Sequence, residues 1–193
     1  MRIITLTLLT VLLTISCSKS LNKEEEARTT VDFSKSVADK GIWLLVKKGK
    51  RELVVYQGKK PIKKMKISIG RGDSSKKERV SDLKTPEGDY YICELRKSKS
   101  FYKSILISYP NDKDAESGLK RNLINDDEYK RIVFAIKNYE TPPQDTMLGG
   151  QICIHGGGVW FWNWTQGCIA IENTDIDYLF SICNKKNRVV IIH

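Results

Sequence analysis

The sequence predicts an α+β, β-rich domain, built as a mixed sheet sandwich or a partly closed barrel with about two helices. Short apolar runs rich in β-branched and aromatic residues recur between Gly, Pro, Asn and Asp, and only two segments show helical periodicity. The chain has 193 residues, a length that suits a single core. We therefore expect one folded domain.

The predicted strands begin with two hairpin signals. The apolar runs are IWLLVKK, ELVVYQ and KKMKISIG, and the turn-forming segments GKR and GKK follow the first two of them. Further strands are predicted in GDYYICEL and SILISYP. The C-terminal RVVIIH is apolar without alternation, which favours a strand that is covered on both faces.

The two predicted helices have identifiable start signals. Asn125 followed three residues later by Glu128 resembles a capping box, and it leads into EYKRIVFAIKN, whose apolar residues recur on one face. Thr174 is predicted to cap a second helix in DIDYLFSICN. The polar residues around this start are assigned to the helix rather than to catalysis: Glu172, Asn173 and Asp175.

The N-terminal residues are typical of an export signal. Residues 1–16 contain one charge and then an apolar run that is too short to span a membrane, which predicts a signal peptide. Cys17 follows a small residue and resembles the lipobox cysteine of bacterial lipoproteins, although ordinary cleavage and secretion remain an alternative. Residues 17–40 have the composition of a flexible tether, and residues 41–193 form the predicted domain. We expect a lipid-anchored protein of the cell envelope, facing the periplasm or wall.

The net charge of +10 favours anionic surroundings. Basic residues are scattered through KKGKR, KKPIKK, SSKKER and NKKN, and no aromatic residues alternate with them as a base-stacking surface would require. Nucleic acid is therefore not a predicted partner. Attraction to an anionic envelope and a merely solvated Lys-rich surface both remain open.

Cysteines and histidines limit the chemistry. The spacings of the five cysteines match neither a metal site nor a disulfide framework, so Cys93, Cys153 and Cys183 are predicted to be buried thiols, although one disulfide would be permitted. His155 is one of only two histidines, and it precedes a run of three glycines and then Cys168. An imidazole can take the proton of a thiol, so this pair predicts cysteine-dependent acyl transfer. Papain-like enzymes are disfavoured, because they place the cysteine before the histidine.

The same segment resembles the L,D-transpeptidase catalytic domain, also called the YkuD domain. The resemblance rests on His155-Gly156 and on Thr165-Gln166-Gly167-Cys168. It extends to KTPEGDYYI, ISYPN and TPPQDTMLGGQICIHGGG, and it covers essentially residues 43–193.

The resemblance implies a role for each motif residue. Cys168 would be the nucleophile and His155 the general base, with the Gly156 carbonyl orienting the imidazole. The amides of Gly167 and Cys168 would form the oxyanion hole, next to the motif residue Thr165. The implied substrates are peptidoglycan stem peptides, and no metal or organic cofactor is expected.

Two features of the segment qualify these expectations. The family commonly has Arg or Asn two residues after the cysteine, and this chain has Ala170, which indicates altered specificity. An aromatic run lies between base and nucleophile and is interpreted either as a substrate groove or as core packing: Trp160, Phe161, Trp162 and Trp164. Transpeptidation, hydrolysis of the same substrates, and non-catalytic wall binding remain the alternative functions.

Overall fold

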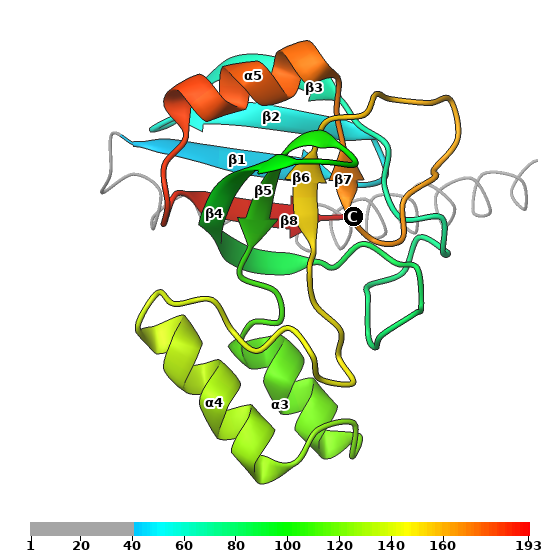
Figure 1. Ribbon diagram of the computed structural model, residues 1–193, viewed down its shortest axis with the longest axis vertical. Coiled ribbons are helices and arrows are strands. Elements are labelled where there is room, and N and C mark those ends of the chain that lie inside the picture. The colour runs from blue at the N-terminus through cyan, green and yellow to red at the C-terminus, as the bar shows by residue number, and fades with distance from the viewer. Residues whose placement is uncertain (1–40) are drawn as a thin grey trace, which may run out of the picture. The chain divides into compact units, whose positions relative to one another are not determined.

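The computed structural model describes residues 41–193. The predicted signal peptide, Cys17 and the tether lie outside these residues. Within them the chain forms an eight-stranded sheet with the order β3-β2-β1-β8-β4-β5-β6-β7, together with three helices (Figure 1). The strands are β1 Ile42–Lys47, β2 Glu52–Gln57, β3 Lys60–Lys66, β4 Gly88–Ser98, β5 Tyr102–Ile107, β6 Cys153–His155, β7 Ile169–Ala170 and β8 Arg188–Ile192.

The sheet is mixed, as the sequence predicts. β1 runs antiparallel to β2 and parallel to β8, while β4 pairs antiparallel with both β8 and β5. β5 pairs antiparallel with β6, and β6 pairs parallel with β7. Ser68, just beyond β3, forms an isolated antiparallel bridge with Ala170 of β7, so the two ends of the strand order approach each other. The sheet therefore curls into a half-barrel, which confirms the predicted partly closed barrel.

Helix α5, Asn173–Ile182, covers the concave core of this sheet (Figure 1). Its buried residues Ile176 and Leu179 belong to a cluster of strand residues that includes Leu44, Ile105 and Ile154. Each of these side chains is fully buried. Burying a side chain of this size contributes about 1.5–3 kcal/mol, so this packing is the main source of the domain's stability.

Helix α5 begins two residues earlier than the sequence suggests. Its N-cap is Glu172, which makes no side-chain capping hydrogen bond, and Thr174 lies inside the first turn. The prediction of Thr174 as the cap is therefore wrong. The side chains of Glu172 and Asn173 instead accept hydrogen bonds from backbone N–H groups of the loop that follows His155.

Helices α3, Asp112–Lys120, and α4, Asp126–Lys137, pack against each other beside the sheet (Figure 1). The predicted capping box of α4 is confirmed, because the Glu128 N–H donates to Asn125 Oδ1 and the Asn125 N–H donates to Glu128 Oε2, both at 2.9 Å. Helix α3 was not predicted, so the expected two helices become three. None of the helices in residues 41–193 has the length and apolar composition that crossing a membrane would require.

Candidate active site

The parallel pair β6 and β7 brings His155 and Cys168 together. Ile154 pairs with Ile169, and Cys168 immediately precedes β7. Because side chains alternate along a strand, Cys153 and His155 lie on the face opposite to Ile154, and Cys168 lies beside them on the same face. The two residues that the sequence separates by a glycine-rich loop therefore meet through strand pairing.

The imidazole of His155 is held in one tautomer. Its Nδ1 lies 2.6 Å from the Gly156 carbonyl oxygen, which can only accept, so Nδ1 carries the proton. The ring stacks on Phe101 at a centroid distance of 4.2 Å and meets the edge of Trp164 at 5.7 Å. Nε2 therefore carries no proton and can accept one, and the neighbouring His155 side chain lowers the pKa of Cys168.

The Cys168 thiol is partly exposed and surrounded by donors. The Cys153 thiol donates to it, the Cys153 backbone N–H lies 3.4 Å from its Sγ, and His155 adds a further hydrogen bond. Together these hold the pKa of Cys168 well below its ordinary value, although burial opposes the shift. The same hydrogen bond and burial raise the pKa of Cys153. Cys168 is therefore the thiol that ionises, and Cys153 is the one that stays protonated.

This difference between the thiols predicts selective alkylation. Because the pKa of Cys168 is lowered, its thiolate is retained as the pH falls below about 8.5, where a free cysteine becomes protonated. Iodoacetamide is expected to modify Cys168 at neutral pH. It should leave three buried cysteines of the native protein unmodified: Cys93, Cys153 and Cys183. Peptide mass spectrometry over pH 5–9 measures the pH at which Cys168 alkylation is half-maximal. The guanidinium-unfolded protein is the control. Equal reaction of all four thiols would contradict the assignment.

A tight turn presents Cys168. The Thr165 hydroxyl donates to the Cys168 carbonyl oxygen at 2.6 Å and accepts the Gly167 N–H at 3.2 Å. Gly167 has a φ of +126°, and a Cβ at this position would lie 2.8 Å from the Lys84 carbonyl oxygen. The turn therefore requires glycine. In this structure the Gly167 amide, implied as an oxyanion donor, is bonded to Thr165.

The start of α5 holds the glycine-rich loop that follows His155. Asn173 Oδ1 accepts the Gly157 N–H at 3.0 Å, and Glu172 Oε1 accepts the Val159 N–H at 2.9 Å. The sequence places both residues at the helix start, and the structure adds this second role. Their side chains stabilise the loop instead of capping the helix.

The aromatic residues divide into two groups. Trp160, Phe161 and Trp162 expose 51%, 85% and 46% of their surface. Their backbone is held by Arg51, whose guanidinium donates to the carbonyl oxygens of all three residues. Trp164 instead packs on His155, with a buried Nε1–H that has no partner among the described residues. Arg51 lies more than 100 positions away along the chain, and no local sequence signal indicates its role.

A cavity of about 400 Å³ opens beside His155 and Cys168. Its walls come from β4, the β4–β5 turn, β5 and β6, whereas Trp160 and Trp162 do not line it. Besides Cys153, His155 and Cys168, the lining residues are Arg96, Lys97, Ser98, Lys99, Ser100, Phe101, Ser104 and Gln151. Ala170 is fully buried and exchanges backbone hydrogen bonds with Ser68 at 2.8 and 2.9 Å, so it contributes no polar group to the cavity.

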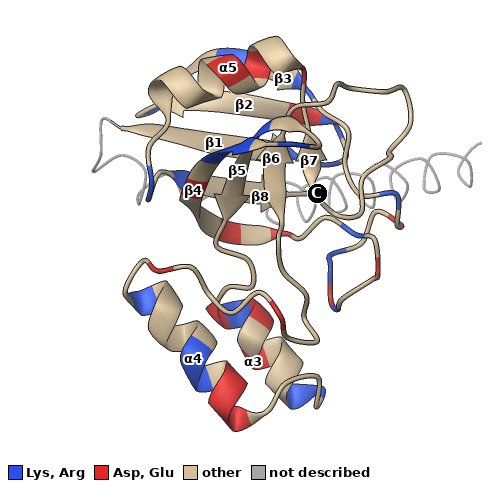
Figure 2. Cartoon of the chain, in the orientation of Figure 1, with Lys and Arg blue, Asp and Glu red and all other residues tan. Residues whose placement is uncertain are grey.

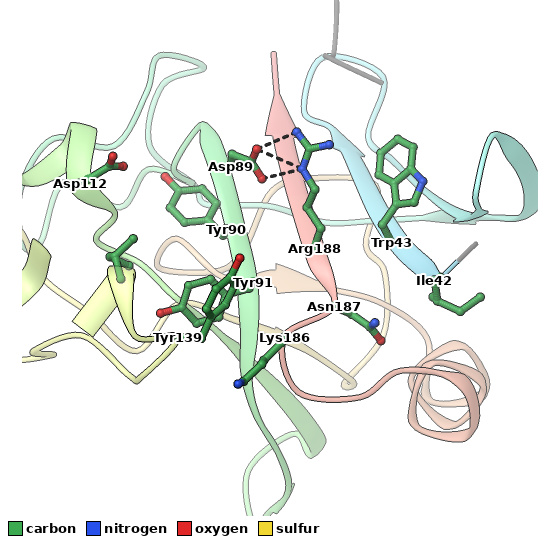
Figure 3. A pocket seen from close by; sticks show the side chains of 12 residues that line it. Ile42, Trp43, Asp89, Tyr90, Tyr91, Asp112, Tyr139, Lys186, Asn187 and Arg188 are labelled. Carbon is green, nitrogen blue, oxygen red and sulfur yellow. Dashed lines mark hydrogen bonds and ion pairs between the residues drawn. The ribbon is translucent and has the colours of Figure 1, made fainter. Parts of the chain in front are cut away.

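A second cavity, of about 590 Å³, lies elsewhere, between β1, β4, β8 and α4 (Figure 3). Arg188 and Asp89 pair across its wall at 2.6 Å, and Tyr91 and Tyr139 contribute aromatic surface. Neither His155 nor Cys168 lines it. Within residues 41–193, no three His, Cys, Asp or Glu side chains are grouped as metal ligands would be.

Comparison with known proteins agrees with this geometry. The sequence profile of the L,D-transpeptidase catalytic domain, YkuD, matches residues 41–191. No curated protein sequence matches the chain.

Solved structures with a similar fold include three proteins. A mutant of the helical cell shape determining protein Pgp2 from Campylobacter jejuni has a TM-score of 0.53 at 25% identity, covering 79% of this chain and 47% of that one. Bd1075 from Bdellovibrio bacteriovorus has a TM-score of 0.52 at 21% identity, and the match covers 80% of this chain and 49% of Bd1075. An L,D-transpeptidase from Xylanimonas cellulosilytica has a TM-score of 0.51 at 14% identity, and the match covers 80% of this chain and 61% of that protein. The chain therefore spans about half the length of these proteins.

Proposed function

The chain belongs to the L,D-transpeptidase catalytic domain family, and on this premise we propose that it is an exported peptidoglycan-remodelling enzyme that acts through a thioester on Cys168. The observation that carries the proposal is the pairing of a low-pKa thiol with an imidazole in a fixed tautomer. A thiolate is the reactive form of a cysteine nucleophile, and the fixed imidazole is positioned to move its proton.

The first step is acylation. The Cys168 thiolate attacks the carbonyl carbon on the L-centre of the third stem residue, and the protonated His155 donates to the departing amine of D-alanine. A C–S bond forms and a C–N bond breaks, which leaves a thioester. The tetrahedral oxyanion is stabilised by the Cys168 amide and by the Gly167 amide, which exchanges its long bond to Thr165 for the oxyanion.

The second step regenerates the thiol. His155, now neutral, accepts a proton from the incoming nucleophile, which attacks the thioester and releases Cys168. An amine of a neighbouring stem would give a crosslink, an amine of a protein would give wall attachment, and water would give a trimmed stem. Transpeptidation is the leading assignment. Hydrolysis is the second candidate, because Ala170 supplies no polar group where the family commonly has Arg or Asn.

The test uses purified protein and tetrapeptide muropeptides, with products analysed by mass spectrometry. We expect crosslinked dimers, loss of D-alanine and an acyl adduct on Cys168, and none of these with Cys168→Ala. Trimmed stems alone would assign the hydrolase. Absence of both turnover and adduct would contradict enzymatic function and leave non-catalytic wall binding.

The proposed location follows from the N-terminal sequence. A signal peptide over residues 1–16 and a lipidated Cys17 would place the domain outside the cytoplasm, tethered to a membrane near its polymeric substrate. Mass spectrometry of the mature N-terminus distinguishes the cases: acyl chains on Cys17 support the anchor, and an unmodified new terminus supports plain secretion.

A further inference from the structure

The cavity beside Cys168 has a basic wall. Arg96, Lys97 and Lys99 line it together with the catalytic pair, and Figure 2 shows the blue of Lys and Arg where β4 approaches β5. A cavity lined by cations raises the local concentration of anionic ligands. The nucleophile therefore faces a space that favours a negatively charged group.

A single residue, Gln151, connects Arg96 to Cys168. Its Nη2 donates to Gln151 Oε1 at 3.0 Å, and the backbone carbonyl oxygen of Gln151 lies 3.5 Å from Cys168 Sγ. Gln151 has a φ of +55°, a left-handed conformation that side-chain-bearing residues adopt rarely and that clusters at functional sites. This contact fixes the guanidinium at the edge of the reaction space.

Arg96 also donates to Ser104 Oγ at 3.4 Å, and its one carboxylate partner among the described residues indicates what the guanidinium binds. Its Nη1 lies 3.2 Å from Glu94 Oε2, and the two side chains are 39% and 43% exposed. An ion pair this exposed contributes little to stability, so Glu94 is easily displaced. The planar fork of a guanidinium matches a carboxylate with two parallel hydrogen bonds, which a ligand entering the cavity could form.

We propose that Arg96 binds a carboxylate of the acyl donor in place of Glu94, and that it thereby selects donors by their affinity for the cavity beside Cys168. The inference rests on the proposed function, because it takes the donor to be a stem peptide. Two carboxylates of a tetrapeptide stem can fill the role: the terminal carboxylate of the departing D-alanine, or a side-chain carboxylate of the third residue. Lys97 and Lys99 add charge without the fork geometry.

Binding is measured by isothermal titration calorimetry in the Cys168→Ala protein, so that no turnover is needed. Three donors are compared: the tetrapeptide, its terminal amide, and the peptide amidated on the third side chain. Adding Arg96→Gln is expected to weaken binding of the unmodified tetrapeptide about tenfold or more. One amidated donor should bind Arg96 protein as weakly as the Arg96→Gln variant, and that donor identifies the carboxylate. Arg96→Lys should recover part of the affinity.

The matched control is Lys130→Gln, which removes one exposed positive charge from α4, outside the cavity lining. Its affinity for all three donors should be unchanged. Equal affinities of the Arg96 and Arg96→Gln proteins would overturn the inference, as would an equal loss for all three donors.

Turnover separates this inference from the proposed function. With Cys168 present, Arg96→Gln should raise KM about tenfold and change kcat by less than about threefold, because it removes binding rather than chemistry. If the binding pattern holds but Cys168 forms no thioester with any donor, the proposed function fails and the carboxylate site stands. If the thioester forms but Arg96→Gln leaves both affinity and KM unchanged, the inference fails alone.

Discussion

Replacing His155 with Gln is expected to slow acylation of Cys168 by about 10²–10⁴-fold. Glutamine retains a polar side chain between Phe101 and Trp164, but it cannot accept the thiol proton or return it to the leaving amine. The variant's rate should rise with pH, because only direct ionisation of Cys168 then supplies the thiolate. The effect is measured as the rate of thioester formation at several pH values, by mass spectrometry of samples quenched at successive times.

The chain contains its own control for this substitution. His193 is the other histidine, and its side chain is 65% exposed, near Glu87 at 3.7 Å. His193→Gln should acylate at the wild-type rate. A His155→Gln protein that keeps a wild-type melting temperature and more than about a tenth of the wild-type rate would show that His155 is not the base, since a positioned base contributes about 10²-fold or more.

Replacing Gly70 with Ala is expected to destabilise the domain by about 3 kcal/mol or more, at the upper end of the cost of overpacking. A Cβ on Gly70 would lie 2.2 Å from the Leu83 carbonyl oxygen, 3.0 Å from the Thr85 backbone nitrogen and 3.1 Å from the Gly167 Cα. All three are backbone atoms, which cannot rotate away. For a domain of this size the loss lowers the melting temperature by about 6–12 °C, measured by circular dichroism or calorimetry.

The same substitution should also disturb the nucleophile. Gly70 forms an isolated parallel β-bridge with Thr165, and its N–H donates to the Thr85 hydroxyl at 2.9 Å. A displaced Gly70 would therefore move the turn that presents Cys168. Gly49→Ala is the matched control, because a Cβ there meets nothing nearer than 3.6 Å. If Gly70→Ala melts within about 1 °C of Gly49→Ala, the close packing described for this turn is wrong.

The parts of the fold that depend on neighbouring residues could be predicted from the sequence. The hairpins β1–β2 and β2–β3, the C-terminal strand β8 and the capping box of α4 lie where the alternation of apolar runs and turn residues places them. The buried state of Cys93, Cys153 and Cys183 was predicted as well, since each lies in an apolar run. His155 and Cys168 were selected as the candidate pair because only two histidines compete for the role of base.

The features that could not be predicted from the sequence depend on contacts between distant segments. Helix α3, DKDAESGLK, has few apolar residues, and its cap Asn111 follows an apparent strand, so no periodicity reveals it. Arg51 and Arg96 are ordinary surface cations in the sequence. The curl of the sheet brings Arg51 to the aromatic loop, and the β4–β5 pairing brings Arg96 to the cavity beside Cys168. The contact of Cys153 with Cys168 likewise follows from strand register.

The position of β8 determines the order in which the fold can be completed. β1, β2 and β3 form one half of the sheet and β4, β5, β6 and β7 the other, and β8 is the strand between the facing edges of β1 and β4. Until residues 188–192 have been synthesised, both edges lack their partner and are open to pairing with other chains. The sheet is therefore closed by contacts of long sequence separation, which are entropically costly and slow to form. The two halves of the sheet can therefore join only once residues 188–192 are available to pair with both edges.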